Sequence, residues 1–99
     1  MRKAARIDSN HTEIVKHFRY CGATVKSLAA IGKGMPDLLV SWRNITWLVE
    51  IKTTKGKLTE DQIDFHKEWD GCMAIVRSPE EVEGVMGQMN FQAELLASN

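Results

Sequence analysis

The sequence has few cysteines and prolines, no long apolar run and no net charge. Its two cysteines, Cys21 and Cys72, lie far apart without a Cys-x-x-Cys pair. This pattern disfavours a zinc site and favours reduced, partly buried thiols. No apolar stretch approaches the roughly 18 residues that a membrane span needs. The basic start over Met1–Arg6 has no apolar signal core after it. These absences predict a cytoplasmic protein without a membrane partner.

The chain is of a size and composition that fit one globular domain. It has 99 residues, of which 43% are hydrophobic and 26% are charged. No repeat, low-complexity stretch or Pro-rich or Ser-rich linker marks a domain boundary. We therefore expect a single domain over residues 1–99, with a basic arm at 1–7 and a tail at 91–99 that either frays or docks. A core of this modest size is compatible with a larger dimeric assembly.

The charges balance overall but are unevenly distributed along the chain. Residues 1–57 hold eleven Lys or Arg and four Asp or Glu, whereas residues 58–99 hold two and nine. This asymmetry indicates a basic face, suited to nucleic acid, and an acidic face. Two solvated surfaces without a partner are about equally consistent with it, because halves of a sequence need not be halves in space.

Apolar periodicity and turn residues predict the order helix, three strands, helix, strand, helix. We expect helices over about 9–21, 59–70 and 78–89 and strands over 23–31, 38–42, 45–51 and 72–76. Asp8, Ser9 or Asn10 is expected to cap the first helix, and Thr59 with Gln62 fits a capping box on the second. The fold class is therefore α/β, with a mixed sheet flanked by helices.

The clearest hairpin joins 38–42 to 45–51 through a two-residue turn at Arg43-Asn44. Cross-strand partners then have residue numbers with a constant sum, which places Asp37 directly opposite Glu50. Opposed residues have Cβ atoms about 4.5–5.5 Å apart. Because strand side chains alternate, Lys52 projects to the same face as Glu50. Three charged groups are thus expected to converge at the open end of the hairpin.

Two carboxylates this close repel each other unless a cation lies between them. Mg²⁺ prefers hard oxygen ligands, so Asp37, Glu50 and the backbone carbonyl of Ile51 are candidate metal ligands. Lys52 would hold a water or stabilise charge on phosphate oxygens. The alternative is that Asp37 is a turn residue and that Glu50 and Lys52 form an exposed ion pair. An isolated Glu-x-Lys favours that alternative, whereas the register and the apolar strand favour the metal site.

The motifs Pro36-Asp37, Glu50-x-Lys52 and a following helix that bears Gln62, in this order, resemble the PD-(D/E)XK nuclease superfamily. The segments 57–62 and 65–69 make the chain similar to the stand-alone VRR-NUC domains of bacteriophages and bacteria, over roughly residues 8–85. The resemblance implies a restriction-endonuclease-like core, dependence on Mg²⁺ or Mn²⁺, and endonuclease action on DNA. For a phage-encoded chain, the location would be the cytoplasm of the bacterial host.

The resemblance also implies roles for particular residues. Asp37 and Glu50 would be metal ligands, Lys52 the catalytic lysine, and Gln62 a member of the active-site set. The role of Gln62 in the site competes with its role in the capping box. The first helix of the superfamily often gives an acidic residue to the site, and Glu13 is the candidate here. It is either a residue close to the metal or a solvated glutamate.

Compact VRR-NUC proteins resemble Holliday-junction resolvases and act as homodimers, which suits symmetric cutting of two strands. Candidates for burial between subunits, or alternatively in the monomer core, are Val82, Met86, Met89, Trp42 and Trp47. Candidate phosphate contacts are Lys33, Lys55, Lys57 and, on the basic arm, Arg6. Such contacts position DNA without reading sequence, so recognition of branching is expected. The alternatives are a nicking or flap nuclease and a catalytically inert nucleic-acid-binding domain.

Overall fold

The computed structural model describes residues 9–98 of the chain. Its elements follow the predicted order: α1 (Ser9–Tyr20), β1 (Thr24–Ser27), β2 (Leu38–Trp42), β3 (Ile45–Ile51), α2 (Glu60–Glu68), β4 (Met73–Val76) and α3 (Pro79–Ala97). The basic arm expected at 1–7, with Arg6, lies outside the described residues. No helix in the described part of the chain combines the length and the apolar character that crossing a membrane requires.

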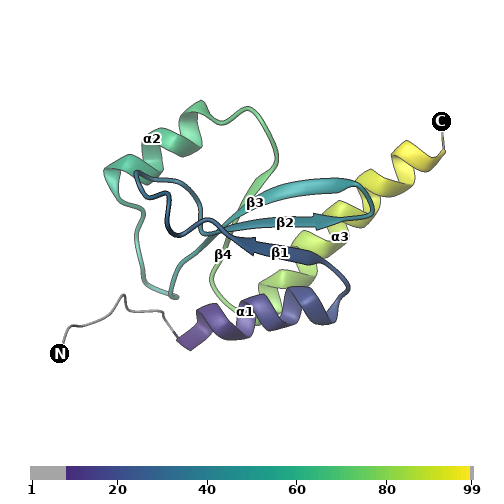
Figure 1. Cartoon of the computed structure of the whole chain (residues 1–99), viewed down its shortest axis with the longest axis horizontal. Helices are drawn as coiled ribbons and strands as arrows, with labels where there is room; N and C mark the ends of the chain where they lie inside the picture. The colour runs from purple at the N-terminus through teal and green to yellow at the C-terminus, as the bar shows by residue number, and fades with distance from the viewer. Residues whose placement is uncertain (1–8, 99) are drawn as a thin grey trace.

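The four strands form one mixed sheet in the order β1-β2-β3-β4. The first three strands pair antiparallel, and β4 runs parallel to β3. A parallel neighbour needs a crossover connection, and the segment that contains α2 supplies it. Figure 1 shows α2 at the end of the sheet away from the β2–β3 turn, while α1 and α3 run alongside the strands. This arrangement leaves the end of β3 close to α2.

The hydrophobic core lies between one face of the sheet and the pair α1 and α3. It contains Ile14 and Phe18 of α1, alternate residues of β2 and β3, and the apolar stripe of α3. Because strand side chains alternate, the residues between these core positions, Glu50 among them, point to the opposite face. The candidate site and the main core therefore lie on opposite sides of the sheet.

The last helix extends eight residues beyond the predicted end at Met89 and includes most of the expected tail. Its apolar stripe continues past Met89 to Ala93, which is 5% exposed, so packing extends the helix. The same packing shows whether the apolar residues considered for a subunit interface are buried within the monomer instead. Val82, Met86, Met89 and Trp47 are buried in the monomer core, and Trp42 is partly buried against it.

The β2–β3 hairpin has the predicted turn and register. Arg43 and Asn44 have φ angles of 53° and 68°, the left-handed values that a type I′ turn requires at both central positions. The pairs run from Trp42↔Ile45 to Leu38↔Val49. The Arg43 guanidinium also donates hydrogen bonds to Asn90 and Glu94 of α3, at 2.9 and 3.0 Å. The turn is thus anchored to the long helix.

The first strand is shorter than predicted and ends at Ser27 instead of Ile31. The Ser27 hydroxyl accepts a hydrogen bond from the backbone N–H of Ala29, and two turns follow, closed by hydrogen bonds from the N–H groups of Ile31 and Met35. The N–H of Leu28 still donates to the carbonyl of Asp37 at 2.8 Å, and local turns replace cross-strand hydrogen bonds only after that residue. The resulting loop leads directly into Pro36 and Asp37.

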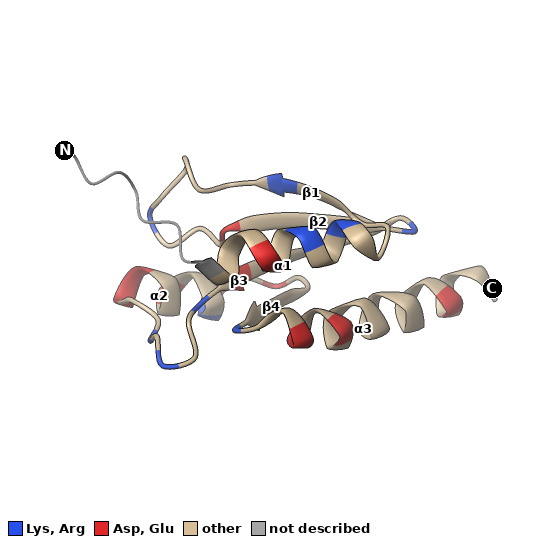
Figure 2. Cartoon of the chain, turned by 90° about the horizontal axis from the view of Figure 1, so that it is seen from below, with Lys and Arg blue, Asp and Glu red and all other residues tan. Residues whose placement is uncertain are grey.

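The charges of the two sequence halves are partly separated in space. Figure 2 shows Asp and Glu along α3 and at the start of α2, and Lys and Arg on β1, on α1 and in the loop after β3. The described part of the chain thus has an acidic α3, whereas the basic groups lie on the elements that carry or precede the candidate site.

Candidate active site

Asp37 and Glu50 meet at the open end of the β2–β3 hairpin. Asp37 directly precedes the pair Leu38↔Val49, so the register places it opposite Glu50. Asp37 is half-buried. Glu50, at 1% exposure, is the only charged residue that is fully buried among the residues the structure describes. One oxygen of Asp37, Oδ2, accepts a hydrogen bond from the backbone N–H of Ile51 at 2.8 Å. The aspartate is therefore fixed against the backbone that follows Glu50, next to the carbonyl proposed as a third ligand.

The pKa of Glu50 is raised from 4.5 to about 8. Burial is the largest cause, followed by the charge of the neighbouring Asp37; the Lys52 ammonium opposes the shift. Lys52 Nζ lies 3.9 Å from Glu50 Oε2, a distance at which its charge offsets only part of the effect. At neutral pH and without a cation, Glu50 therefore keeps its proton.

The residues present fit a hard divalent cation. Glu50 Oε1 is buried and has no hydrogen-bond partner among the described residues. Leaving a buried acceptor without a partner costs about 1–3 kcal/mol. A divalent cation between Glu50 and Asp37 would provide that missing partner and would favour the ionised carboxylate. Oxygen ligands of this kind suit Mg²⁺ or Mn²⁺.

Lys52 is held at its backbone from two sides. Its N–H donates to the carbonyl of Val76, and its own carbonyl accepts from Asn10 Nδ2 at 3.1 Å. Asn10 Nδ2 also lies 3.3 Å from the carbonyl of Arg77, and Asn10 Oδ1 is buried without a partner in the described structure. Asn10 was predicted as a helix cap, but it lies inside α1, and its side chain joins α1 to the ends of β3 and β4.

The Gln62 side chain makes the capping-box contact and also contacts Glu50, so the structure does not force a choice between the two predicted positions of this side chain. Its carbonyl Oε1 accepts from the backbone N–H of Thr59 at 2.9 Å, which completes the capping box with the Thr59 hydroxyl. Its amide Nε2 donates to Glu50 Oε2 at 3.0 Å. The two roles are compatible because the amide has an acceptor and a donor end. The helix cap therefore sets the position of the group that touches Glu50.

Glu13 is not brought to the carboxylate pair. It is exposed on α1, and within residues 9–98 it forms no three-residue ligand group with Asp37 and Glu50. The structure thus favours the solvated glutamate of the two alternatives.

His66 lies one turn after Gln62 and was not identified from the sequence. Its Nε2 is buried without a partner in the described structure, and burial together with the Lys52 charge lowers the pKa of its ring. The imidazole is therefore neutral beside the lysine. Its position follows the helical spacing from Gln62, which was the available signal.

Two basic loops adjoin the carboxylate pair along the chain. Lys33 lies between two glycines, and a Cβ at Gly34 (φ +83°) would overlap the Asp61 backbone, so this loop rests on the first turn of α2. Lys55 and Lys57 are exposed in the loop after Lys52. The Arg77 guanidinium donates to the carbonyls of residues 53 and 56 at 2.8 and 2.7 Å, which anchors that loop. Both loops present cations to solvent.

A scan against protein-family models and a search of curated proteins gave no match for this chain. A search of solved structures found a protein described as a VRR_NUC domain, with a TM-score of 0.65 and 27% sequence identity. The alignment covers 77% of this chain and 88% of that protein. The helix and strand order, the mixed sheet and this match agree with one another. The chain has the fold of a VRR-NUC nuclease domain.

Proposed function

We propose that this chain is a metal-dependent DNA endonuclease that hydrolyses phosphodiester bonds at Asp37, Glu50 and Lys52. The observation that carries the proposal is a buried glutamate opposite an aspartate, with one oxygen lacking a partner and a lysine alongside, in a VRR-NUC fold. A buried carboxyl whose pKa is strongly raised by desolvation and by a specific charged neighbour is a candidate for a functional site.

Asp37 and Glu50 would hold Mg²⁺ or Mn²⁺, with the Ile51 carbonyl as a further oxygen. When bound, such an ion polarises a phosphoryl oxygen and lowers the pKa of a water. The Lys52 ammonium would stabilise the charge that develops on the phosphate oxygens. Gln62 donates to Glu50 Oε2, which leaves Oε1 available for the ion.

The expected substrate is branched DNA, with a Holliday junction as the leading candidate. The candidate phosphate contacts Lys33, Lys55 and Lys57 are exposed loop residues, and phosphate contacts position a duplex without reading its sequence. We therefore expect selection by DNA shape.

Symmetric cutting of a junction requires two sites, so we propose that the active form is a homodimer. The residues predicted for its interface are mostly buried in the monomer. The last turns of α3 instead expose Phe91, Leu95 and Leu96, with exposures of 65%, 52% and 61%. We assign this surface to contact with a second copy of the chain.

The test is cleavage of a four-way junction, a flap, a nicked duplex and a linear duplex of the same sequence, in Mg²⁺ and in Mn²⁺. The proposal predicts paired symmetric cuts in the junction and a dimer by light scattering. If the protein is a stable monomer that prefers the flap or the nicked duplex, the result would contradict junction resolution and support a nicking or flap nuclease. No cleavage of any DNA in either metal would favour a nucleic-acid-binding domain.

A matched pair of variants separates the two roles of Gln62. Thr59→Ala is expected to lower the free energy of unfolding by about 1 kcal/mol through loss of the cap, and to retain cleavage. Gln62→Ala loses the cap contact and also the donor to Glu50, so we expect a similar loss of stability together with a marked loss of cleavage rate. Urea unfolding and single-turnover rates measure both. Equal rates for the two variants would contradict the active-site role.

A further inference from the structure

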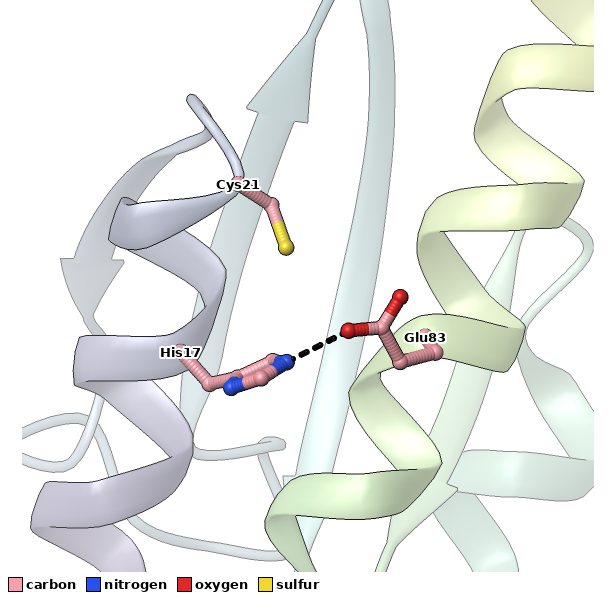
Figure 3. Close-up of side chains that lie close together, drawn as sticks. All are labelled: His17, Cys21 and Glu83. Atoms are coloured by element: carbon pink, nitrogen blue, oxygen red, sulfur yellow. Dashed lines mark hydrogen bonds and ion pairs between the residues drawn. The ribbon is translucent and has the colours of Figure 1, made fainter.

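A second cluster of metal-ligating side chains lies between α1 and α3. It consists of His17 and Cys21 on α1 and Glu83 on α3, whose ligand atoms all lie within 4.8 Å of one another. Figure 3 shows the Cys21 sulfur and the His17 ring directed toward the side of α3 that carries Glu83. His17 Nε2 and Glu83 Oε2 are hydrogen-bonded at 2.7 Å.

We propose that His17, Cys21 and Glu83 form a second metal site, which binds Zn²⁺ or another thiolate-binding divalent cation and joins α1 to α3. Imidazole nitrogen, thiolate sulfur and carboxylate oxygen are the three ligand types that Zn²⁺ takes in proteins. Three protein ligands leave a fourth position for water. The Glu83 side chain is 69% exposed, so water reaches that position from the solvent side.

The fold holds these groups together independently of any ion. A spacing of four residues puts His17 and Cys21 on the same face of α1. The backbone N–H of Cys21 donates to the carbonyl of His17 at 3.0 Å, which keeps both in the last helical turn. Phe18 and Val82, each 0% exposed, belong to the core that joins the two helices. An ion that binds here would therefore have to order few protein groups.

The sequence analysis disfavours a zinc site because the two cysteines form no Cys-x-x-Cys pair. The structure needs no such pair, since His17 and Cys21 on α1 and Glu83 on α3 supply three ligands. Ion binding requires the Cys21 thiol to release its proton to solvent. It also requires His17 Nε2, which donates its N–H to the Glu83 carboxylate, to lose that proton to solvent or by a change of tautomer to Nδ1, so that its lone pair can face the ion. Burial and the Glu83 charge raise the pKa of the Cys21 thiol. A divalent cation bound between the thiolate and the carboxylate would offset the repulsion between these two negative groups, because it attracts both.

This site differs from the carboxylate pair in place and in chemistry. Asn10, the α1 residue that contacts the Lys52 carbonyl, lies seven residues before His17, which is about 10 Å along a helix. Thiolate and imidazole select zinc-like ions, whereas two carboxylates select Mg²⁺ or Mn²⁺. We therefore expect each site to take its own ion, with the zinc-like ion stabilising the helix pair.

The direct test is titration of the reduced, metal-free full chain with Co²⁺, which reports thiolate coordination by a charge-transfer band. We expect one equivalent to produce this band together with the visible bands of a tetrahedral ion. Cys21→Ser should abolish the charge-transfer band, whereas Cys72→Ser, at the other half-buried cysteine, should retain it. Asp37→Asn should also retain it, because the carboxylate pair has no sulfur. Circular dichroism verifies the fold of each variant.

Glu83→Gln changes an exposed side chain, so we expect the variant to keep the fold. Its Zn²⁺ affinity is expected to fall by more than about 10-fold, since even partners that only hydrogen-bond a metal ligand contribute 10–100-fold. Zn²⁺ should also raise the thermal midpoint of the wild type and of Cys72→Ser, but not that of Cys21→Ser. Absence of the charge-transfer band, or its loss in Cys72→Ser instead of Cys21→Ser, would overturn the proposal and leave an interhelical ion pair.

Discussion

Replacing Lys52 with alanine is expected to lower the rate of DNA cleavage by roughly 10²–10³-fold, the usual cost of removing one group that stabilises transition-state charge. Lys52 is 16% exposed beside Glu50, and its backbone is fixed by β4 and Asn10, so no other side chain readily takes its place. Single-turnover rates at saturating Mn²⁺ measure the effect and separate it from weaker metal binding.

The matched control is Lys16→Ala, which removes one positive charge from an exposed position on α1. It should change the cleavage rate little at moderate salt. If Lys52→Ala cleaved at the wild-type rate, or if both variants lost activity equally, Lys52 would contribute only to general attraction of DNA.

The metal-free protein is expected to lose stability as the pH rises from about 4.5 to about 8, by a few kcal/mol through Glu50 alone. The sign follows from the raised pKa of Glu50. Below about 4.5 the carboxyl holds a proton in both the folded and the unfolded protein. Between pH 4.5 and about pH 8, only the folded protein keeps the proton on Glu50. Unfolding therefore releases a proton in this range and becomes more favourable as the pH rises. Urea unfolding in the presence of a chelator, across this range, measures the change.

Glu50→Gln is the isosteric control for this prediction. Its amide cannot ionise, and its carbonyl still accepts the hydrogen bond from Gln62. The difference between wild type and variant removes contributions from other groups, including His66, whose lowered pKa acts in the opposite direction. Saturating Mg²⁺ should restore wild-type stability at high pH and leave the variant unchanged. Parallel pH profiles for the two proteins would show that Glu50 ionises normally.

The hairpin and the carboxylate pair were predictable because local chemistry determines them. A two-residue turn fixes the register of its strands, and the alternation of side chains then fixes which residues share a face. Arg43-Asn44 therefore sufficed to bring Asp37 opposite Glu50. The capping box of Thr59 and Gln62 was likewise visible, although its link to Glu50 depends on how α2 packs.

The remaining features depend on tertiary contacts that periodicity does not encode. The end of α3 is set by burial of Met89 and Ala93, and the early end of β1 by hydrogen bonds in the following turns. Asn10 reaches Lys52 only because the first turn of α1 lies beside the ends of β3 and β4. The cluster at His17, Cys21 and Glu83 requires the packing of two helices that are far apart in the sequence.

The most direct test of the proposed active site is the anomalous scattering of Mn²⁺ in crystals of the full chain. A single strong peak is expected between Asp37 and Glu50, bonded to oxygens of both carboxylates at about 2.0–2.2 Å, as hard divalent ions require. A peak elsewhere, with no metal density between these two carboxyl groups, would contradict the assignment of this pair as the metal site.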